Sequence, residues 1–388
     1  MLMNRELKIG LMISIATILL FFLALEIVLR IVYPDNPEML WQPDQELWIV
    51  HAPNFTTTIK APYGETRVTT NSFGMRDKEI MPKQLGQYRI LVVGDSITFG
   101  LGIALDETYP RVLERKLKAA LPTKNIEVLN FGIPAYGTDR ELIYLKYHID
   151  RIQPDLIVLG FYVANDISDN LAGQRFRVEG GRLIKNTEYL DNKIELRRAS
   201  YQLKKTFYSY AWLSDRLYFL IRVINEWINL HVPVRLDESI FRYELLLKDT
   251  PPRILEGWKL TAALVGEMAS TAKAHGAEFM MLIIPDDIQY DRRKWEQMKA
   301  VANLRDADVD LNKSVEEALA MCTRLEVNCI NLLPRFKEER EPLTWENDPH
   351  ANVRGHEVMA DGLAKHLIEL GILEISIAPS TTEQQYKS

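Results

Sequence analysis

Cysteine and histidine are scarce in this sequence, basic residues are fewer than acidic ones, and glycine-rich phosphate-binding loops are missing. The 388 residues include two cysteines and seven histidines, and 47 lysines and arginines are outnumbered by 53 aspartates and glutamates. A net charge of −6 gives no reason to expect a nucleic acid as a partner. The glycines at Gly94 and Gly100 form neither a GxGxxG pattern nor a P-loop, which disfavours a nucleotide-binding protein.

The two cysteines, Cys322 and Cys329, have no cysteine or histidine partners nearby of the kind that a zinc site requires. In an exported domain they are consistent with a local disulfide. Two independent buried thiols are the alternative, and the sequence leaves both interpretations open.

One long uncharged run stands out near the start of the chain, at Ile9–Leu25. About 17 apolar residues, extended by those around Glu26 and Arg30, can span a hydrocarbon core of about 30 Å. Two basic residues precede the run, which predicts a cytoplasmic N-terminus and an exported main domain. The absence of a small-x-small cleavage site favours an uncleaved anchor over residues 1–34. A removed signal peptide and a buried core helix are the alternatives.

Residues 35–86 predict an extended segment between the membrane and the main domain. Its short alternating pieces, Thr56–Ile59 and Thr66–Thr70, indicate strands or a hairpin. Asn71–Asp77 has the residue types of a turn. Arg76 is interpreted first as part of that turn, with a place near the active site as the alternative. The polar tail, residues 376–388, is expected to be frayed.

Strands and helices alternate within residues 87–375. Apolar runs predict five strands, at Ile90–Val93, Ile126–Phe131, Asp155–Tyr162, Glu278–Ile284 and Cys329–Leu333. Helical spacing predicts helices at Glu107–Leu121, Thr138–Ile152, Trp258–His275, Asp308–Thr323 and Val353–Leu370. The pattern predicts a three-layer α/β fold, with a flavodoxin-like five-stranded parallel sheet and helices on both faces.

An insertion at residues 171–256 interrupts this alternation. Within it, Arg197–Leu230 is predicted to be helical and mixes aromatic with basic residues. Such a mixture is found in helices that lie on a membrane surface. Helix packing, as a cap over the active site, is the preferred interpretation.

The sequence RILVVGDSITFG, Arg89–Gly100, places a serine directly after a predicted strand and a glycine turn. Open α/β sheets bind their ligands at the carboxyl edge of the strands. Ser96 is therefore the candidate nucleophile. A serine becomes reactive only when a base removes its proton and a third group orients that base.

His350 is the candidate base because it lies in a loop between the last predicted strand and the last predicted helix. Asp348 stands two residues earlier and can reach the other imidazole nitrogen. Hydrogen-bond donors for the negative charge on the attacked carbonyl are available at three strand ends. They are the backbone N–H of Ser96, a backbone N–H in the loop at residues 130–137, and the side-chain amide of Asn165.

Four sequence blocks resemble those of the SGNH/GDSL hydrolase superfamily. They are Gly94-Asp95-Ser96 with Thr98 and Gly100, Asn130–Thr138 (NFGIPAYGT), Asn165-Asp166, and Asp348–His356 (DPHANVRGH). The resemblance implies Ser96 as nucleophile, His350 as base and Asp348 as its orienting acid. It also implies an oxyanion hole made by Ser96, Ala135 and Asn165, and it implies neither a metal ion nor an organic cofactor.

The chain departs from the superfamily pattern at two positions. Ala135 stands where glycine is common, and the choice between the N–H groups of Ala135 and Gly137 stays open. The acid often lies three residues before the histidine, where this chain has Asn347. Asp348 instead matches the D-x-H variant of exopolysaccharide acetylation proteins that resemble alginate O-acetyltransferases.

These observations favour a membrane-anchored, exported serine esterase. Its expected substrate is an O-acyl ester such as an acylated cell-surface glycan, and acetyl is the favoured acyl group. An O-acyltransferase acting on a polysaccharide with the same residues is the first alternative. A non-catalytic glycan-binding or assembly protein is the second. The acyl chain, the alcohol and the oligomeric state do not follow from the sequence.

Overall fold

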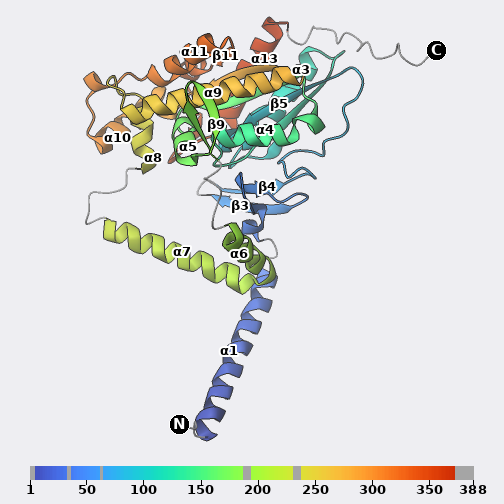
Figure 1. Cartoon of the computed structure of the whole chain (residues 1–388), viewed down its shortest axis with the longest axis vertical. Coiled ribbons are helices and arrows are strands. Elements are labelled where there is room, and N and C mark those ends of the chain that lie inside the picture. Colours follow the sequence, from blue (N-terminus) through green and yellow to red (C-terminus); the bar gives the residue numbers. More distant parts are fainter. Residues whose placement is uncertain (1–4, 33–35, 62–63, 187–193, 230–236, 372–388) are drawn as a thin grey trace, which may run out of the picture.

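The computed structural model describes residues 5–32, 36–61, 64–186, 194–229 and 237–371. Its first element, α1 (Arg5–Val32), projects from the rest of the chain as one long helix (Figure 1). The portion Lys8–Val32 is long and apolar enough to cross a membrane, and the protein buries none of its most apolar window. By length and composition, α1 is a signal sequence or a single membrane anchor. The predicted polar tail lies outside the described residues.

A five-stranded sheet forms the centre of the main domain, in the order β11-β10-β7-β5-β6. The strands are β5 (Gln87–Gly94), β6 (Asn125–Gly132), β7 (Leu156–Tyr162), β10 (Glu278–Ile284) and β11 (Asn328–Asn331). Every neighbouring pair is parallel. In chain order this arrangement is 2-1-3-4-5, the flavodoxin-like order, so the predicted fold class is confirmed.

Helices cover both faces of this sheet (Figure 1). The predicted helices are observed as α3 (Tyr109–Ala120), α4 (Thr138–Ile152), α9 (Pro252–Ala274), α11 (Lys313–Leu325) and α13 (Val353–Glu369). In β5, Ile90 and Val92 enter the core beneath α3 and α13. Leu91 and Val93 enter the opposite core, beneath α4 and α9. The near-continuous apolar strands of the sequence are thus explained by burial on both sides of the sheet.

The segment before the sheet folds into two antiparallel hairpins. One joins β1 (Trp41–Asp44) to β2 (Trp48–His51), and the other joins β3 (Thr56–Ala61) to β4 (Gly64–Thr69). The second hairpin is the one that alternation in the sequence predicts. The first was not predicted, because its strands are short and carry no clear alternation.

Arg76 connects the following turn to the candidate active site. Its side chain is 1% exposed, and its guanidinium donates hydrogen bonds to the carbonyls of Phe99, Gly100 and Ile103 at 2.9, 2.7 and 2.6 Å. Burial lowers the pKa of Arg76 to about 10. The residue therefore belongs to the structural turn and also supports the chain that leaves the candidate nucleophile.

The insertion contains helices and a short hairpin. The helical structure predicted for Arg197–Leu230 is confirmed, but as two helices, α6 (Ile194–Thr206) and α7 (Tyr208–Asn229), which Phe207 separates; Leu230 lies outside the described residues. A hairpin of β8 (Phe176–Glu179) and β9 (Arg182–Lys185) precedes them. Helix α8 (Asp237–Glu244) follows. Cys322, near the end of α11, and Cys329 in β11 form a disulfide, which decides between the two interpretations of the cysteines.

Candidate active site

The turn after β5 presents Ser96 at the carboxyl edge of the sheet. It lies between β5 and β7, where the strand order reverses and where open α/β sheets bind ligands. Ser96 begins α2 (Ser96–Phe99), and Asp95 caps this short helix by accepting the N–H of Ile97 at 2.8 Å. Gly94 is required here because a Cβ at this position would lie 2.1 Å from the Oγ1 of Thr98.

Ser96, His350 and Asp348 form one chain of hydrogen bonds. The Oγ of Ser96 lies 2.8 Å from the Nε2 of His350. The Nδ1 of His350 lies 2.5 Å from the Oδ1 of Asp348, which also accepts the backbone N–H of His350 at 2.8 Å. When Nδ1 carries the proton and donates to Asp348, Nε2 is free to accept the proton of the Ser96 hydroxyl.

A small hairpin and a helix cap hold the loop that carries His350. Strand β12 (Thr344–Trp345) pairs with β13 (Asp348–Ala351), and Asn352 caps α13 by accepting the N–H of Gly355 at 3.0 Å. Burial raises the pKa of Asp348, but the hydrogen bonds from His350 and the positive charge of Lys294 outweigh burial and leave this pKa below its ordinary value. Asp348 is therefore a carboxylate at neutral pH, as an acid that orients a histidine must be.

The loop after β6 brings Ala135 to the surface in an unusual conformation. Ala135 has a φ of +64°, in the left-handed region where residues with a Cβ are uncommon. Its side chain is exposed, whereas Gly137 is buried, with Asp169 only 2.8 Å from an added Cβ. The glycine that is common at the Ala135 position in the superfamily is thus explained by this backbone conformation.

The loop after β7 places Asn165 beside the Ser96 turn. The Nδ2 of Asn165 donates a hydrogen bond to the Oδ2 of Asp95 at 3.1 Å. Asp166 orders the loop by accepting the N–H of Tyr162 at 2.7 Å. His356 is buried and structural: it accepts the N–H of Tyr109 at 3.1 Å, and burial lowers its pKa to about 3.

Buried carboxyl groups gather behind this edge of the sheet. Asp95, Glu141 and Asp166 are essentially inaccessible to solvent, and each has its pKa raised, first by burial. The negative charges of Asp95, Asp139 and Asp169 raise the pKa of Glu141 further. Neither carboxyl oxygen of Glu141 has a hydrogen-bond partner among the described residues.

Glu141 is expected to make stability depend on pH. Its folded pKa lies well above the ordinary 4.5, so the native state holds a proton that the unfolded chain releases. The stabilisation is complete below pH 4.5 and is lost as the pH rises toward the folded pKa, by at most about 1.4 kcal/mol per pH unit. As the pH rises from 5 to 8, the melting temperature of Glu141→Gln should therefore fall less than that of the wild type. Glu316→Gln, on an exposed position of α11, is the matched control and should follow the wild type. Parallel profiles for wild type and Glu141→Gln would contradict this assignment.

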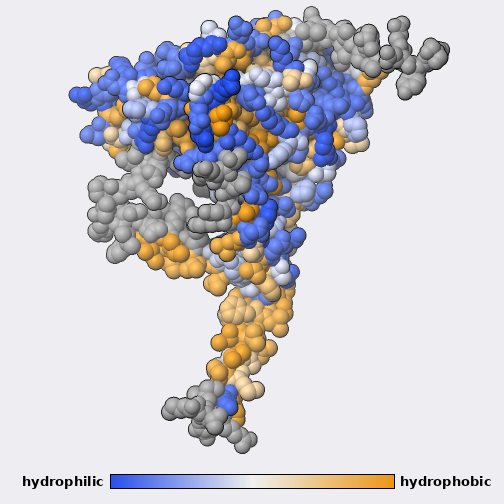
Figure 2. All heavy atoms as spheres, viewed as in Figure 1, coloured by the Kyte–Doolittle hydropathy of each residue, from blue (hydrophilic) through white to orange (hydrophobic). Residues whose placement is uncertain are grey.

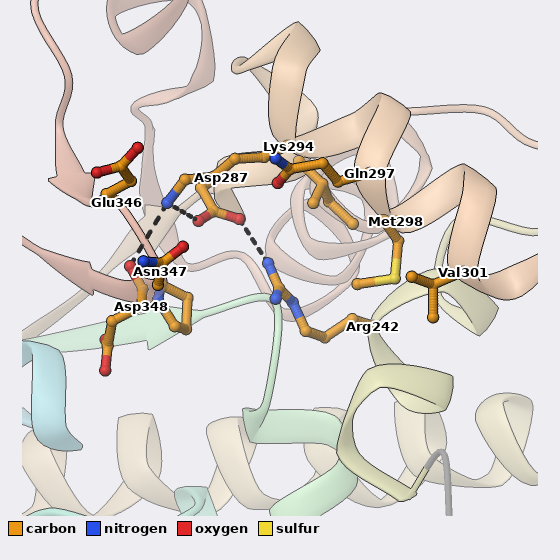
Figure 3. Close-up of a pocket in the computed structure, with 11 residues that line it drawn as sticks. Arg242, Asp287, Lys294, Gln297, Met298, Val301, Glu346, Asn347 and Asp348 are labelled. Carbon is orange, nitrogen blue, oxygen red and sulfur yellow. Dashed lines mark hydrogen bonds and ion pairs between the residues drawn. The ribbon is translucent and has the colours of Figure 1, made fainter.

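A pocket of about 350 Å³ opens beside Asp348 (Figure 3). It is lined by Arg242 of α8, Asp287 and Ile288, by Lys294, Gln297, Met298 and Val301 of α10 (Arg292–Ala302), and by Glu346, Asn347, Asp348 and Pro349. Figure 3 shows the carboxylate of Asp348 pointing away from Arg242.

An ion-pair network builds one wall of this pocket. Arg242 pairs with both Asp286 and Asp287. Lys294 lies 2.7 Å from Asp287 and donates to the carbonyl of Trp345 at 2.7 Å, which ties α10 to the loop of His350. Asp286 and Asp287 are both buried, although they follow β10 in a loop. Their cationic partners lie 44 and 7 residues away along the chain, so no local pattern predicts them.

No group of three or more histidines, cysteines, aspartates and glutamates within the described ranges is arranged to hold a metal ion. Of the predicted site residues, Ser96 and Asp348 each hydrogen-bond His350, and Asn165 hydrogen-bonds Asp95, the residue before Ser96.

All of the predicted site residues lie within the part of the chain that matches a known protein family. The model of the GDSL-like lipase/acylhydrolase family matches residues 92–358. Similar solved structures include the lipase/acylhydrolase from Enterococcus faecalis, with 14% identity over 73% of this chain and 96% of that chain, and a TM-score of 0.39. A catalytic mutant of Axe2, an acetylxylan esterase from Geobacillus stearothermophilus, has 15% identity over 73% and 94%, and a TM-score of 0.37. No curated protein matches the chain.

Proposed function

Because the chain belongs to the GDSL-like lipase/acylhydrolase family and is an acylhydrolase acting on ester bonds, we propose that Ser96 is its nucleophile, His350 its base and Asp348 the acid that orients the base. The observation that carries this proposal is the hydrogen-bonded chain from Ser96 through His350 to Asp348. These three residues together supply the nucleophile, the base and the orienting acid that ester cleavage requires.

The reaction proceeds in two halves. The Oγ of Ser96 attacks the ester carbonyl while its proton moves to the Nε2 of His350. His350 then gives this proton to the departing alcohol oxygen, and an acyl-serine remains. Water attacks the acyl-serine with His350 again as base, and the acid is released with Ser96 restored. Asp348 stays ionised and stabilises the imidazolium that forms in each half.

The oxyanion hole in this proposal consists of the Ser96 and Ala135 N–H groups and the side-chain amide of Asn165. The exposed position of Ala135 supports it as the second backbone donor, since Gly137 is buried against Asp169. Asn165 has a second amide N–H besides the one given to Asp95, and this N–H is its contribution to the oxyanion.

Asn165→Ala is expected to lower kcat by about 100- to 1,000-fold, because one preorganised oxyanion donor is worth about 3 kcal/mol. Steady-state hydrolysis of a chromogenic acetyl ester measures the effect. Ala135→Gly is the companion variant: it keeps the backbone N–H and suits the positive φ, so it should retain wild-type kcat. An Asn165→Ala variant with unchanged kcat would remove Asn165 from the oxyanion hole.

The substrate we propose is an O-acyl ester, with acetyl as the acyl group, on a cell-surface glycan. Helix α1 as an anchor would place the enzyme at the cell surface. The Cys322–Cys329 disulfide supports an oxidising, exported location. The pocket beside Asp348 supports a polar alcohol, because Glu346, Asn347 and Gln297 offer hydrogen-bond donors and acceptors for hydroxyl groups.

The destination of the acyl group distinguishes an esterase from an O-acyltransferase. The full chain in detergent should be incubated with an acetylated oligosaccharide in ¹⁸O-labelled water, with and without an unacetylated acceptor glycan. An esterase releases ¹⁸O-labelled acetate in both reactions. A transferase moves the acetyl group to the acceptor and releases little acetate. If neither product forms while a simple acetyl ester is cleaved, the glycan assignment fails and the esterase assignment stands.

A further inference from the structure

Two charged residues interrupt the apolar surface of α1, and both contact the corner between α6 and α7. Glu26 accepts hydrogen bonds from the backbone N–H groups of Tyr208 at 3.0 Å and Ser209 at 2.8 Å, at the first turn of α7. Arg30 donates to the carbonyl of Thr206 at 2.7 Å, at the end of α6. Glu26 and Arg30 also pair with each other at 2.8 Å. The anchor helix is therefore joined to this corner by its own charged side chains.

The height of this corner along α1 follows from helix geometry. At 1.5 Å per residue, the stretch from Lys8 to Glu26 is about 27 Å long, close to the thickness of a hydrocarbon core. Glu26 thus lies at the far boundary of the membrane when Lys8 lies at the near one. The first turn of α7 is held at that same boundary.

Helix α7 has two contrasting faces. One face turns toward the protein: Ala211 is buried, and Asp215 pairs with Lys204 of α6 at 2.9 Å. The opposite face carries an apolar stripe at i, i+4, i+7, i+8 and i+11 spacing. It consists of Leu213, Leu217, Leu220, Ile221 and Ile224, each 45–55% exposed. Five large aliphatic side chains at helical spacing on one open face are typical of an amphipathic helix whose partner lies outside the described residues.

The position of α7 indicates what covers this stripe. Figure 1 shows α7 leaving α1 sideways, beneath the main domain and at a steep angle to α1. In Figure 2 the hydrophobic surface continues from α1 onto the lower face of α7, on the side away from the main domain. Arg216 lies over the ring of Trp212 at 5.5 Å, next to the stripe, and such pairs of basic and aromatic residues suit the headgroup region of a bilayer.

We propose that α7 lies along the surface of the membrane that α1 spans, with its apolar stripe at the boundary between the lipid headgroups and the acyl chains. The inference rests on the proposed anchorage through α1 and replaces the preference for packing over the active site. It also gives α7 a role. Because Glu26 of α1 and Lys204 of α6 hold the N-terminal half of α7, its position on the bilayer keeps this part of the exported domain close to the membrane.

Spin labels on single introduced cysteines in the full chain, reconstituted into phosphatidylcholine vesicles, test this arrangement. Both native cysteines are paired, so the label attaches only to the introduced one. Leu217→Cys and Ile221→Cys report the stripe, Asp215→Cys is the matched control on the opposite face of the same helix, and Leu19→Cys reports α1. The measurement is the collision of each label with oxygen, which concentrates in lipid, relative to collision with a water-soluble nickel chelate.

The expected result is a severalfold higher oxygen-to-nickel ratio at positions 217 and 221 than at 215, with position 19 higher still. Ratios at 217 and 221 equal to that at 215, with position 19 in lipid, would overturn the surface location of α7 and leave the anchor intact. Labels at 217 and 221 that are shielded from both reagents would overturn it in favour of a second copy or another protein. A water-exposed label at position 19 would instead overturn the anchor itself.

Discussion

Ser96→Ala is expected to lower kcat for ester hydrolysis by about 10⁶-fold, since loss of the nucleophile in a hydrogen-bonded triad removes the acyl-enzyme route entirely. The Oγ of Ser96 lies 2.8 Å from the Nε2 of His350, so alanine removes the proposed nucleophilic atom and leaves the α2 turn in place. Hydrolysis of a chromogenic acetyl ester by the purified full chain measures the change.

Two controls separate chemistry from folding in this experiment. The melting temperature of Ser96→Ala should match that of the wild type, because the hydroxyl contributes one hydrogen bond at a partly open site. Ser270→Ala removes a serine hydroxyl from the surface of α9 and should keep full activity. A Ser96→Ala protein that folds normally and hydrolyses the ester at most of the wild-type rate would refute the assignment of the nucleophile.

His350→Gln is expected to lower kcat about as much as Ser96→Ala, and Asp348→Asn by about 10,000-fold. Among the described residues, His350 is the side chain that hydrogen-bonds the Oγ of Ser96, so its loss leaves the hydroxyl without a base. The amide introduced by Asp348→Asn would still hold the ring, but it would favour the imidazole tautomer with the proton on Nε2, which cannot act as a base. The same ester assay measures both variants.

Asn347→Ala is the matched control for the acid. The superfamily often has its acid at that position, three residues before the histidine, whereas the structure shows His350 bonded to Asp348. Asn347→Ala should therefore keep wild-type kcat for a simple acetyl ester. The double variant Ser96→Ala with His350→Gln should be no slower than either single variant, because the residues act as one unit. A further multiplicative loss in the double variant would show that they act separately.

The sheet and its edge could be predicted because the information is local. Strands such as β7 are nearly continuous apolar runs, and α4 begins and ends at Thr138 and Ile152 as the sequence predicts. The residues proposed for catalysis stand directly after strands or beside the last helix, where fold topology alone brings them together. The choice of Asp348 over Asn347 required the D-x-H resemblance in addition to the topology.

The elements that were missed depend on contacts between distant parts of the chain. The burial of Asp287 in a loop depends on its ion pairs with Arg242, 45 residues away along the chain, and with Lys294 of α10. The break between α6 and α7 at Phe207 has no proline or glycine to mark it, and the contacts of both helices with α1 supply the reason. The interpretation of the insertion as a cap does not account for the exposed stripe of α7, because hydrophobic spacing reveals an apolar face but not the partner that covers it.

Labelling with a serine-reactive phosphonate tests the central claim most directly. The full chain is treated with a fluorophosphonate, digested and analysed by mass spectrometry while the remaining esterase activity is followed. We expect a single adduct on Ser96 of the wild type, and its amount should rise in proportion to the loss of esterase activity. His350→Gln should form no adduct, because its serine is not activated. Full activity after prolonged treatment, or inactivation that tracks an adduct on another residue, would contradict the central claim.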